Sequence, residues 1–239
     1  MTNFKIDLSP KRIIKWVIWG ILAILFLIFI IRVSSFENYY YNSKEGSERD
    51  ASASSGTSED LIETPPTETE VREYIVAADR PRYLTIDKLK IRNARILAMG
   101  VNNKGELDTP RNIFDVGWFQ NSGKPGQGGT MLIDGHNGGP HVHGVFKDLP
   151  NLVSGDLITV ERGDGAIYTY EVVENNSVLL SESDAYMATA LKSPERGTES
   201  LTLISCTGEW SQQQGTYLSR QFVRALLVTD QSNENTESE

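Results

Sequence analysis

The chain has 239 residues, with 23 Lys and Arg against 32 Asp and Glu, and its formal net charge is -9. This length suits one mid-sized domain with additional segments, because domains of about 100 to 150 residues are the commonest. The acidic balance excludes a nucleic-acid partner, since neutralising phosphates requires clusters of Lys and Arg that this sequence lacks.

The N-terminal region has the features of a membrane anchor. Residues 16–31, WVIWGILAILFLIFII, contain no charge, and Ile13 and Ile14 extend the apolar stretch beyond Lys15. With Lys15 snorkelling, this stretch is long enough to cross the hydrocarbon core of a bilayer. It is longer than a typical signal-peptide core, and no small-residue cleavage site follows directly. We therefore expect an uncleaved transmembrane signal anchor at residues 13–33 and not a buried core helix.

The charges on either side of the anchor predict its orientation. Basic residues precede the apolar stretch, whereas acidic residues predominate after it. The positive-inside rule then places residues 1–12 in the cytoplasm and everything after the anchor outside. The sequence thus predicts a single-pass plasma-membrane protein with an extracellular domain.

Two further segments look unable to fold on their own. Residues 34–78 are rich in Ser, Glu and Thr and contain too few apolar residues to build a core, so we expect a disordered stalk. The acidic tail at residues 230–239, DQSNENTESE, is expected to be disordered as well. The folded extracellular domain is therefore predicted to span residues 79–229.

This domain has an all-β pattern. Short runs rich in Val, Ile, Leu, Tyr and Thr, several of them alternating apolar with polar residues, are separated by Gly, Asn, Asp and Pro. In chain order they are YLTIDKLKI, ARILAMGV, GTMLIDGH, DLITVE, AIYTYEVVE, LTLISC and YLSRQFVRALLV. We expect roughly seven or eight strands in a barrel or sandwich, with short helices around VFKDLPNL and SDAYMATAL.

Cys206 is the single cysteine of the chain. It cannot form an intrachain disulfide, so the usual structural reason for a cysteine in an extracellular domain is absent. It is either a small buried hydrophobe at the end of a strand or a nucleophile. A nucleophilic thiol needs a nearby base or cation, together with donors for the oxyanion that forms on the attacked carbonyl.

The candidate base is His136. All three histidines, His136, His141 and His143, lie in the stretch DGHNGGPHVHG, and His136 stands where an apolar run gives way to a Gly-rich loop. Two strand ends that meet at one rim of a barrel would bring His136 and Cys206 together. Asp134, two residues before His136 and on the same face of the strand, is expected to favour the imidazolium.

The candidate oxyanion ligand is Arg220. A polar loop of thirteen residues follows Cys206, and Arg220 begins the next strand. Such a loop returns the chain to the same rim, where a guanidinium suits a carbonyl oxygen that becomes anionic. Arg224 is the competing cation, and we expect it to be an outward, solvated residue of the strand.

In this order, LIDGH ending at His136, TLISC ending at Cys206 and RQFV beginning at Arg220 resemble the motifs of the sortases. These are membrane-anchored cysteine transpeptidases of mainly Gram-positive bacteria. The resemblance runs from about Tyr83 to Val228. It implies an eight-stranded sortase-type β-barrel with one or two short helices, preceded by a single N-terminal transmembrane helix.

The chain departs from the family pattern in two places. Ser205 stands where the family usually has Thr. Next to His136, the chain has Asp134 where the family usually has Ala or Ser, and Asn137 where it usually has residues such as Thr, Arg or Val. Neither change removes an atom that the chemistry needs, but both leave the subclass open.

The resemblance also implies a reaction. Cys206 would attack a backbone carbonyl in a short, LPXTG-like C-terminal sorting signal of a secreted protein and form a thioester. His136 would protonate the departing amine and Arg220 would hold the oxyanion. An amine of a cell-wall precursor or of a pilin would then resolve the thioester. The scheme requires neither a metal nor an organic cofactor.

Several alternatives stay open on the residues alone. The H-x4-H-x-H spacing with Asp134 is compatible with a metal-dependent hydrolase. A non-enzymatic anchored β-domain would leave Cys206 buried, and a sortase-fold endopeptidase would use water in place of the amine. Acidic residues in the segment before the cysteine strand are calcium-ligand candidates: Glu182, Asp184 and Glu199.

Overall fold

The structure is a computed structural model that describes residues 61–102 and 107–230. The predicted anchor at residues 13–33 and almost all of the predicted tail lie outside the described residues, as does the stalk before residue 61. In the described ranges, no helix has the length and apolar character needed to cross a bilayer.

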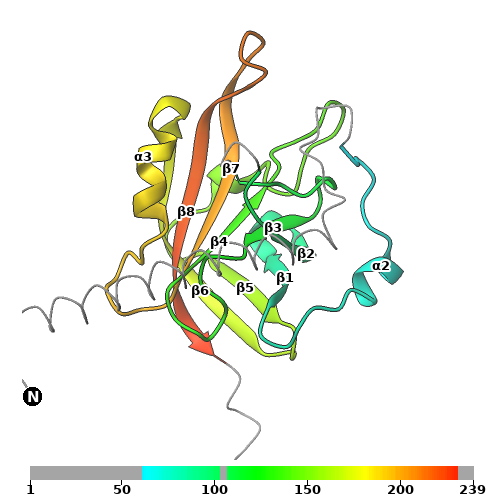
Figure 1. Cartoon of the computed structure of the whole chain (residues 1–239), viewed down its shortest axis with the longest axis vertical. Helices are drawn as coiled ribbons and strands as arrows, with labels where there is room; N and C mark the ends of the chain where they lie inside the picture. The colour runs from blue at the N-terminus through cyan, green and yellow to red at the C-terminus, as the bar shows by residue number, and fades with distance from the viewer. Residues whose placement is uncertain (1–60, 103–106, 231–239) are drawn as a thin grey trace, which may run out of the picture. The chain divides into compact units, whose positions relative to one another are not determined.

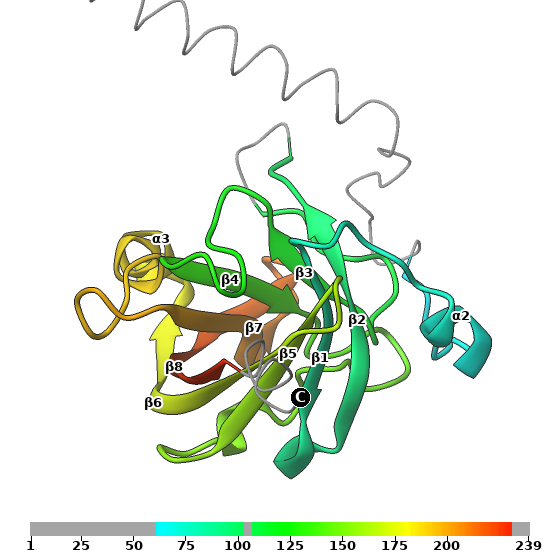
Figure 2. The same cartoon turned by 90° about the horizontal axis from the view of Figure 1, so that it is seen from below.

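Eight strands close into a barrel (Figures 1 and 2). Around the wall the strands follow the order β1-β2-β3-β4-β7-β8-β6-β5. Their bounds are β1 Pro81–Ile86, β2 Ile91–Met99, β3 Val116–Phe119, β4 Thr130–Gly135, β5 Leu157–Arg162, β6 Ile167–Leu179, β7 Ser200–Ser211 and β8 Thr216–Asp230. The prediction of an all-β domain with an eight-stranded barrel is confirmed.

Most neighbouring strands are antiparallel, but two pairs are parallel. β2 pairs with β3, and β4 pairs with β7 in a register that sets Asp134 opposite Ile204. The parallel β4–β7 pair places the end of β4 beside the middle of β7, which is far from it in sequence. The predicted runs include every strand except β3, whose four residues are too short to show an alternation.

The barrel interior holds the hydrophobic core. In β6 the side chains alternate, so that Tyr168, Tyr170 and Val172 are fully buried while their neighbours are only partly covered. Trp118 of β3 is 2% exposed, and its indole N–H donates to the carbonyl of Gly123 at 3.0 Å. Burying a large apolar side chain contributes about 1.5 to 3 kcal/mol, so this alternation fixes which face of each strand points inward.

In the part of the chain that the structure describes, two α-helices lie outside the wall. The helix predicted around SDAYMATAL is α3, Leu180–Ala190, which packs along β6 and β8 (Figure 1). The stretch VFKDLPNL forms only a short 3-10 turn, η3, Leu149–Asn151. The other helix, α2, Glu68–Arg72, lies on the opposite side, against β2. A second 3-10 turn, η2, Asp87–Leu89, connects β1 to β2.

Arg224 is buried, and the prediction that it is a solvated strand residue is wrong. Its exposed fraction is 5%, and its Nη1 lies 2.6 Å from Oε2 of Glu174 on β6. Its Nη2 donates to the carbonyls of Lys192 at 2.8 Å and Thr189 at 3.3 Å, at the end of α3. The outer face of β8 is therefore covered by α3, which a strand pattern alone does not reveal.

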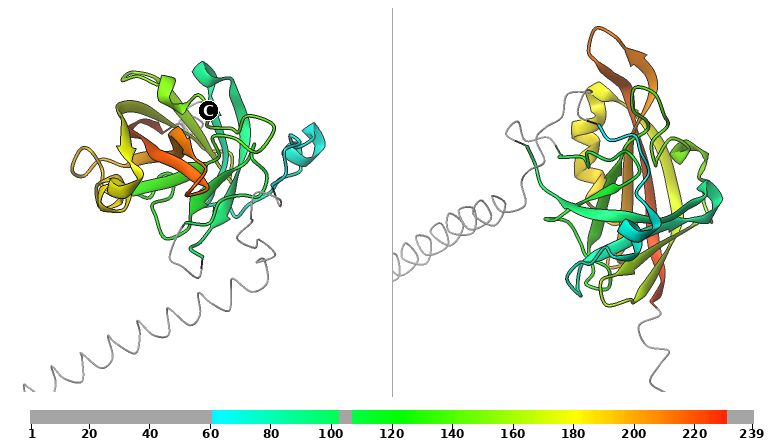
Figure 3. Two further views of the ribbon diagram at one scale, coloured as in Figure 1. Left: turned by 90° about the horizontal axis from the view of Figure 1, so that it is seen from above. Right: turned by 90° about the vertical axis from the view of Figure 1, so that its right-hand side faces the viewer.

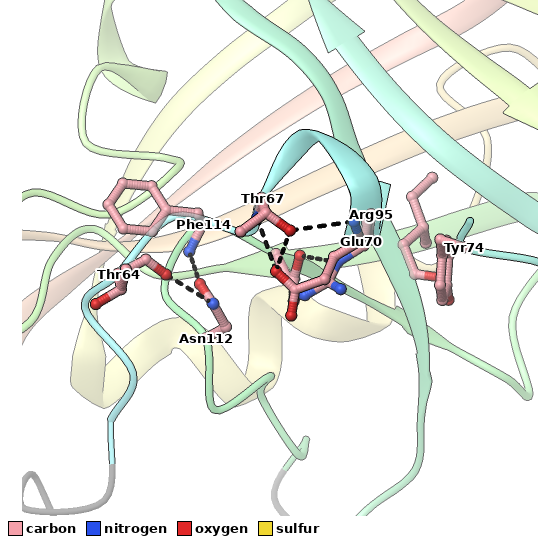
Figure 4. Close-up of polar contacts among 9 residues, drawn as sticks. Thr64, Thr67, Glu70, Tyr74, Arg95, Asn112 and Phe114 are labelled. Atoms are coloured by element: carbon pink, nitrogen blue, oxygen red, sulfur yellow. Dashed lines mark hydrogen bonds and ion pairs between the residues drawn. The ribbon is translucent and has the colours of Figure 1, made fainter. Parts of the chain in front are cut away.

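The last part of the predicted stalk is ordered. Residues 61–80, here called the N-terminal strap, run along the barrel and include α2. A capping box between Thr67 and Glu70 starts α2 (Figure 4). Tyr74 then donates its hydroxyl to the carbonyl of Ile96 at 2.6 Å and accepts at its own carbonyl from Arg82 at 2.8 Å. The prediction of disorder fails here because backbone pairing and the hydrogen bonds of the half-buried Tyr74, rather than buried aliphatic residues, fix the segment.

Candidate active site

Cys206 lies directly opposite Arg220 in the β7–β8 ladder. The prediction that the strand ends at Cys206 is wrong, because β7 continues to Ser211. The predicted thirteen-residue loop is wrong for the same reason: most of it forms a long hairpin that extends beyond the barrel (Figure 3). The predicted proximity of Arg220 to Cys206 is nevertheless found, and it results from strand register.

The guanidinium of Arg220 is held by its own hairpin. Nη1 donates to the carbonyls of Tyr217 at 3.0 Å and Ser219 at 3.1 Å, and Nη2 donates to Oγ1 of Thr216 at 3.3 Å. These bonds fix the cation, and among the described residues no carboxylate forms an ion pair with it. Its positive charge is therefore available to a neighbouring anion.

The Cys206 thiol feels three influences. Burial is the largest and raises its pKa, because a thiolate loses hydration there. The charge of Arg220 acts in the opposite direction and lowers the pKa, while that of Asp134 raises it. The net pKa lies above the ordinary thiol value, so Cys206 is mainly a thiol at neutral pH. The side chain nevertheless retains some exposure to solvent.

His136 follows the last residue of β4, as predicted. Continuing the β4–β7 register by two residues places the backbone of His136 beside that of Cys206. Two side-chain hydrogen bonds join the end of β4 to β7: Ser205 Oγ donates to the carbonyl of Gly135 at 2.9 Å, and Asn137 Nδ2 donates to the carbonyl of Cys206 at 2.8 Å. Asn137 was noted in the sequence only as a departure from the family pattern, and its contact with β7 was not predicted.

The imidazole of His136 has a defined hydrogen-bond partner. Its Nε2 lies 2.8 Å from the carbonyl oxygen of Pro110. A carbonyl only accepts, so Nε2 carries the hydrogen and, in the neutral ring, Nδ1 is the nitrogen that can exchange a proton. Burial lowers the pKa of His136, and the hydrogen bond to Pro110 partly offsets that shift.

Asp134 does not have the predicted effect on His136. Its own pKa is raised to about 7, chiefly by burial, with a smaller contribution from the charge of Asp108 and an opposing hydrogen bond from Thr109. Since the net pKa of His136 is lowered, the imidazolium is not favoured. Gly117 of β3 leaves the space for this carboxylate, because a Cβ there would lie 2.3 Å from Asp134 Oδ1.

The metal-site alternatives find no support in the geometry. His141 and His143 are exposed loop residues. Within residues 61–102 and 107–230, no three His, Cys, Asp or Glu side chains are grouped closely enough to hold a metal ion. Glu199, a candidate calcium ligand, instead accepts from the backbone N–H groups of Gly126 at 3.0 Å and Gly128 at 2.8 Å.

Comparison with protein families decides the assignment. The family model described as the sortase domain matches residues 84–228, which is more than half of the chain. The chain belongs to the sortase family. Sortases are cysteine transpeptidases, and Cys206 is the one cysteine that this sortase contains.

Solved structures similar to this sortase are sortases as well. The sortase D5 transpeptidase of Clostridium perfringens is 23% identical, with a TM-score of 0.44 over 69% of this chain and 90% of that chain. SrtA from Actinomyces oris is 19% identical, with a TM-score of 0.47 over 75% and 95%. A lid mutant of Streptococcus agalactiae sortase C1 is 19% identical, with a TM-score of 0.46 over 66% and 73%. Because these similarities are low, the assignment rests on the domain match. A search of curated proteins finds no significant match.

Proposed function

We propose that this sortase cleaves a short, LPXTG-like C-terminal sorting signal of secreted proteins and transfers the protein to an amine of a cell-wall precursor or a pilin. One observation carries the proposal: Cys206 faces Arg220 across the β7–β8 ladder, and His136 directly follows the adjacent strand β4. A nucleophile, a cation and a proton carrier thus come from three neighbouring strands.

The first half-reaction forms a thioester. The Cys206 thiolate attacks the carbonyl carbon of the scissile peptide bond, and the electron pair of the C=O bond moves onto the oxygen. Arg220 stabilises that oxyanion. When the intermediate collapses, the C–N bond breaks and the departing amine takes a proton from the imidazolium of His136.

The second half-reaction regenerates the enzyme. The amine nucleophile attacks the thioester carbonyl and loses a proton to the neutral imidazole of His136. Collapse of this intermediate forms the new amide bond and releases the Cys206 thiolate. Because the proton taken by His136 is the one that the next cycle requires, the imidazolium is restored together with the thiolate.

The two pKa shifts favour the neutral thiol and imidazole in the resting site. Burial raises the pKa of Cys206 and lowers that of His136. When the thiol pKa exceeds the imidazole pKa, the thiolate–imidazolium pair is a minor species at every pH, and its population is greatest between the two pKa values. We therefore expect a bell-shaped pH dependence of kcat/KM.

We also propose that residues 13–33 anchor the enzyme in the plasma membrane as a single pass, with residues 1–12 in the cytoplasm. The support is the uncharged stretch and its basic N-terminal flank. Protease added to intact cells should remove the catalytic domain and leave a fragment from the N-terminus in the membrane. Full protection of the catalytic domain in intact cells would contradict this orientation.

The test of the activity uses the purified full chain in detergent. It is incubated with a panel of LPXTG-like peptides and an amine, and mass spectrometry follows the protein and the peptides. We expect a thioester on Cys206 and an amide product, and Cys206→Ala should give neither. Failure across the panel, or full activity in Cys206→Ala, would show that the proposal is wrong. A free carboxylate as the sole product would assign hydrolysis instead of transfer.

A further inference from the structure

The N-terminal strap pairs with the segment that leads into β3. The backbone N–H of Ile62 donates to the carbonyl of Arg111 at 2.9 Å, and the carbonyl of Ile62 accepts from the N–H of Ile113 at 3.1 Å. The residue between them, Asn112, donates from Nδ2 to the carbonyl of Thr64 at 3.0 Å (Figure 4). The strap therefore extends this segment as a short parallel bridge.

The next strap residue, Glu63, contacts the loop that follows His136. This loop, residues 137–144, is here called the His loop. Oε1 of Glu63 accepts from the backbone N–H of His141 at 2.8 Å and from that of Val142 at 3.3 Å. Hydrogen bonds to a carboxylate are stronger than those between neutral groups. Glu63 thus joins the strap to the tip of the His loop.

The contact has a matching feature on the loop side. A Cβ at Gly139 would lie 2.2 Å from Oε1 of Glu63. Any other residue at this position would displace the carboxylate from its two N–H partners. Glycine is therefore required for the contact as it stands.

Both contacts of the strap lead to His136. The segment that Ile62 bridges begins next to Pro110, whose carbonyl accepts from Nε2 of the imidazole. The carbonyl of His136 accepts from the N–H of Phe146, two residues after the His loop, at 2.9 Å. The loop itself is closed by a hydrogen bond of 2.7 Å from the N–H of Gly144 to the carbonyl of Asn137. The ring and the main chain of His136 are thus supported by the two segments that the strap holds.

We propose that Glu63 is a positioning residue for His136, acting through the His loop. The proposal rests on the proposed function in so far as His136 is the proton carrier of the reaction. In a near-attack arrangement, a displacement of about 1 Å can lower the rate by about a hundredfold. On this view the strap, which precedes the matched sortase domain, forms part of the catalytic apparatus.

The test compares variants of the full chain in detergent. Glu63→Ala removes the acceptor, Gly139→Ala displaces it from the loop side, and Glu63→Gln retains an oxygen at the same position. Glu68→Ala is the matched control, since Glu68 is an exposed carboxylate of α2 in the same strap. Each variant is assayed for kcat and KM in peptide transfer and for melting temperature.

We expect Glu63→Ala and Gly139→Ala to lower kcat roughly tenfold or more, with KM changed less than about twofold. Glu63→Gln should recover most of the activity, and Glu68→Ala should match the wild type. NMR titration of His136, resolved by replacing the other two histidines, gives a readout that does not depend on turnover. Because burial lowers the pKa of His136, its midpoint should rise toward the ordinary value in Glu63→Ala.

Wild-type kcat and an unchanged His136 titration in both Glu63→Ala and Gly139→Ala would overturn the proposal. An equal loss of kcat in Glu68→Ala would also overturn it. So would a loss of kcat in Glu63→Ala and Gly139→Ala that parallels their loss of melting temperature and is not restored in Glu63→Gln. If the wild type forms no thioester with any peptide, the proposed function fails, whereas the His136 titration in the same variants still decides the positioning role.

Discussion

Arg224→Ala should destabilise the enzyme without altering its chemistry. The guanidinium of Arg224 makes three charge-assisted hydrogen bonds, to Oε2 of Glu174 and to the carbonyls of Lys192 and Thr189. The substitution leaves the carbonyls at the end of α3 without these donors, although a helix C-terminus requires partners for its last carbonyls.

The magnitude follows from the exposure of the two ions. Breaking a fully buried ion pair costs about 3 to 5 kcal/mol. The Arg224 side chain is 6% exposed, but that of Glu174 is 39% exposed and regains water when its partner is removed. We therefore expect a loss of about 2 to 3 kcal/mol, below that of a fully buried pair. In a domain of this size the loss corresponds to a fall of about 4 to 12 °C in melting temperature.

Denaturant and thermal unfolding of the full chain measure the effect. Arg196→Ala is the matched control, because Arg196 is exposed and its removal should change stability by less than about 0.5 kcal/mol. The pH profile of Cys206 alkylation should be the same in Arg224→Ala as in the wild type. Equal stabilities of Arg224→Ala and Arg196→Ala would refute the reasoning from burial, and a changed alkylation profile would refute the assignment of the cation role to Arg220.

Substitutions at Arg220, Asp134 and Trp118 test other parts of the structure. Arg220→Gln should shift the alkylation profile of Cys206 to higher pH, because the charge of Arg220 lowers the pKa of the thiol; an unchanged midpoint would show that the two residues do not interact. Asp134→Asn should shift that profile to lower pH, because the Asp134 carboxylate raises the thiol pKa. Asp134→Asn should also gain melting temperature relative to the wild type as pH rises from about 4 to 7. The pKa of Asp134 is about 7 in the folded protein against 3.8 ordinarily, so the unfolded chain releases this proton more readily and the carboxyl opposes folding increasingly across that range. A difference between the two melting curves that does not vary with pH would contradict this. Trp118→Ala should cost about 3 to 5 kcal/mol in denaturant unfolding, since it empties a large buried site; a loss below about 1 kcal/mol would show that the core collapses around it.

Much of the barrel was predictable because its strands carry their burial pattern in the sequence. The alternation of Tyr168, Tyr170 and Val172 in β6 is visible as AIYTYEVVE. β3 escaped prediction because the four residues VGWF derive their strand conformation from pairing with β2 and β4. A short segment held by its neighbours has no periodicity of its own.

The candidate site was predictable as a set of residues but not as a geometry. Cys206, His136 and Arg220 were chosen from strand ends, and the proximity of Arg220 to Cys206 is present even though the predicted loop is not. The contacts of Asn137 and Glu63 were not predictable, because each side chain binds backbone groups that are distant in sequence. Such groups are identical in every residue and leave no pattern to read.

The parallel pairing of β4 with β7 has a consequence for how reactivity appears during folding. Cys206 and Arg220 belong to one hairpin and can meet through local pairing. His136 follows β4, and the contacts of β4 with β7 join residues far apart in sequence, such as Gly135 and Ser205, which are separated by 70 residues. Contacts at that distance form only when the intervening chain has closed, and closing it is entropically costly. In the proposed mechanism, the thiol therefore gains its proton partner only when β4 pairs with β7, and a partly folded chain would carry the nucleophile without the means to complete a turnover.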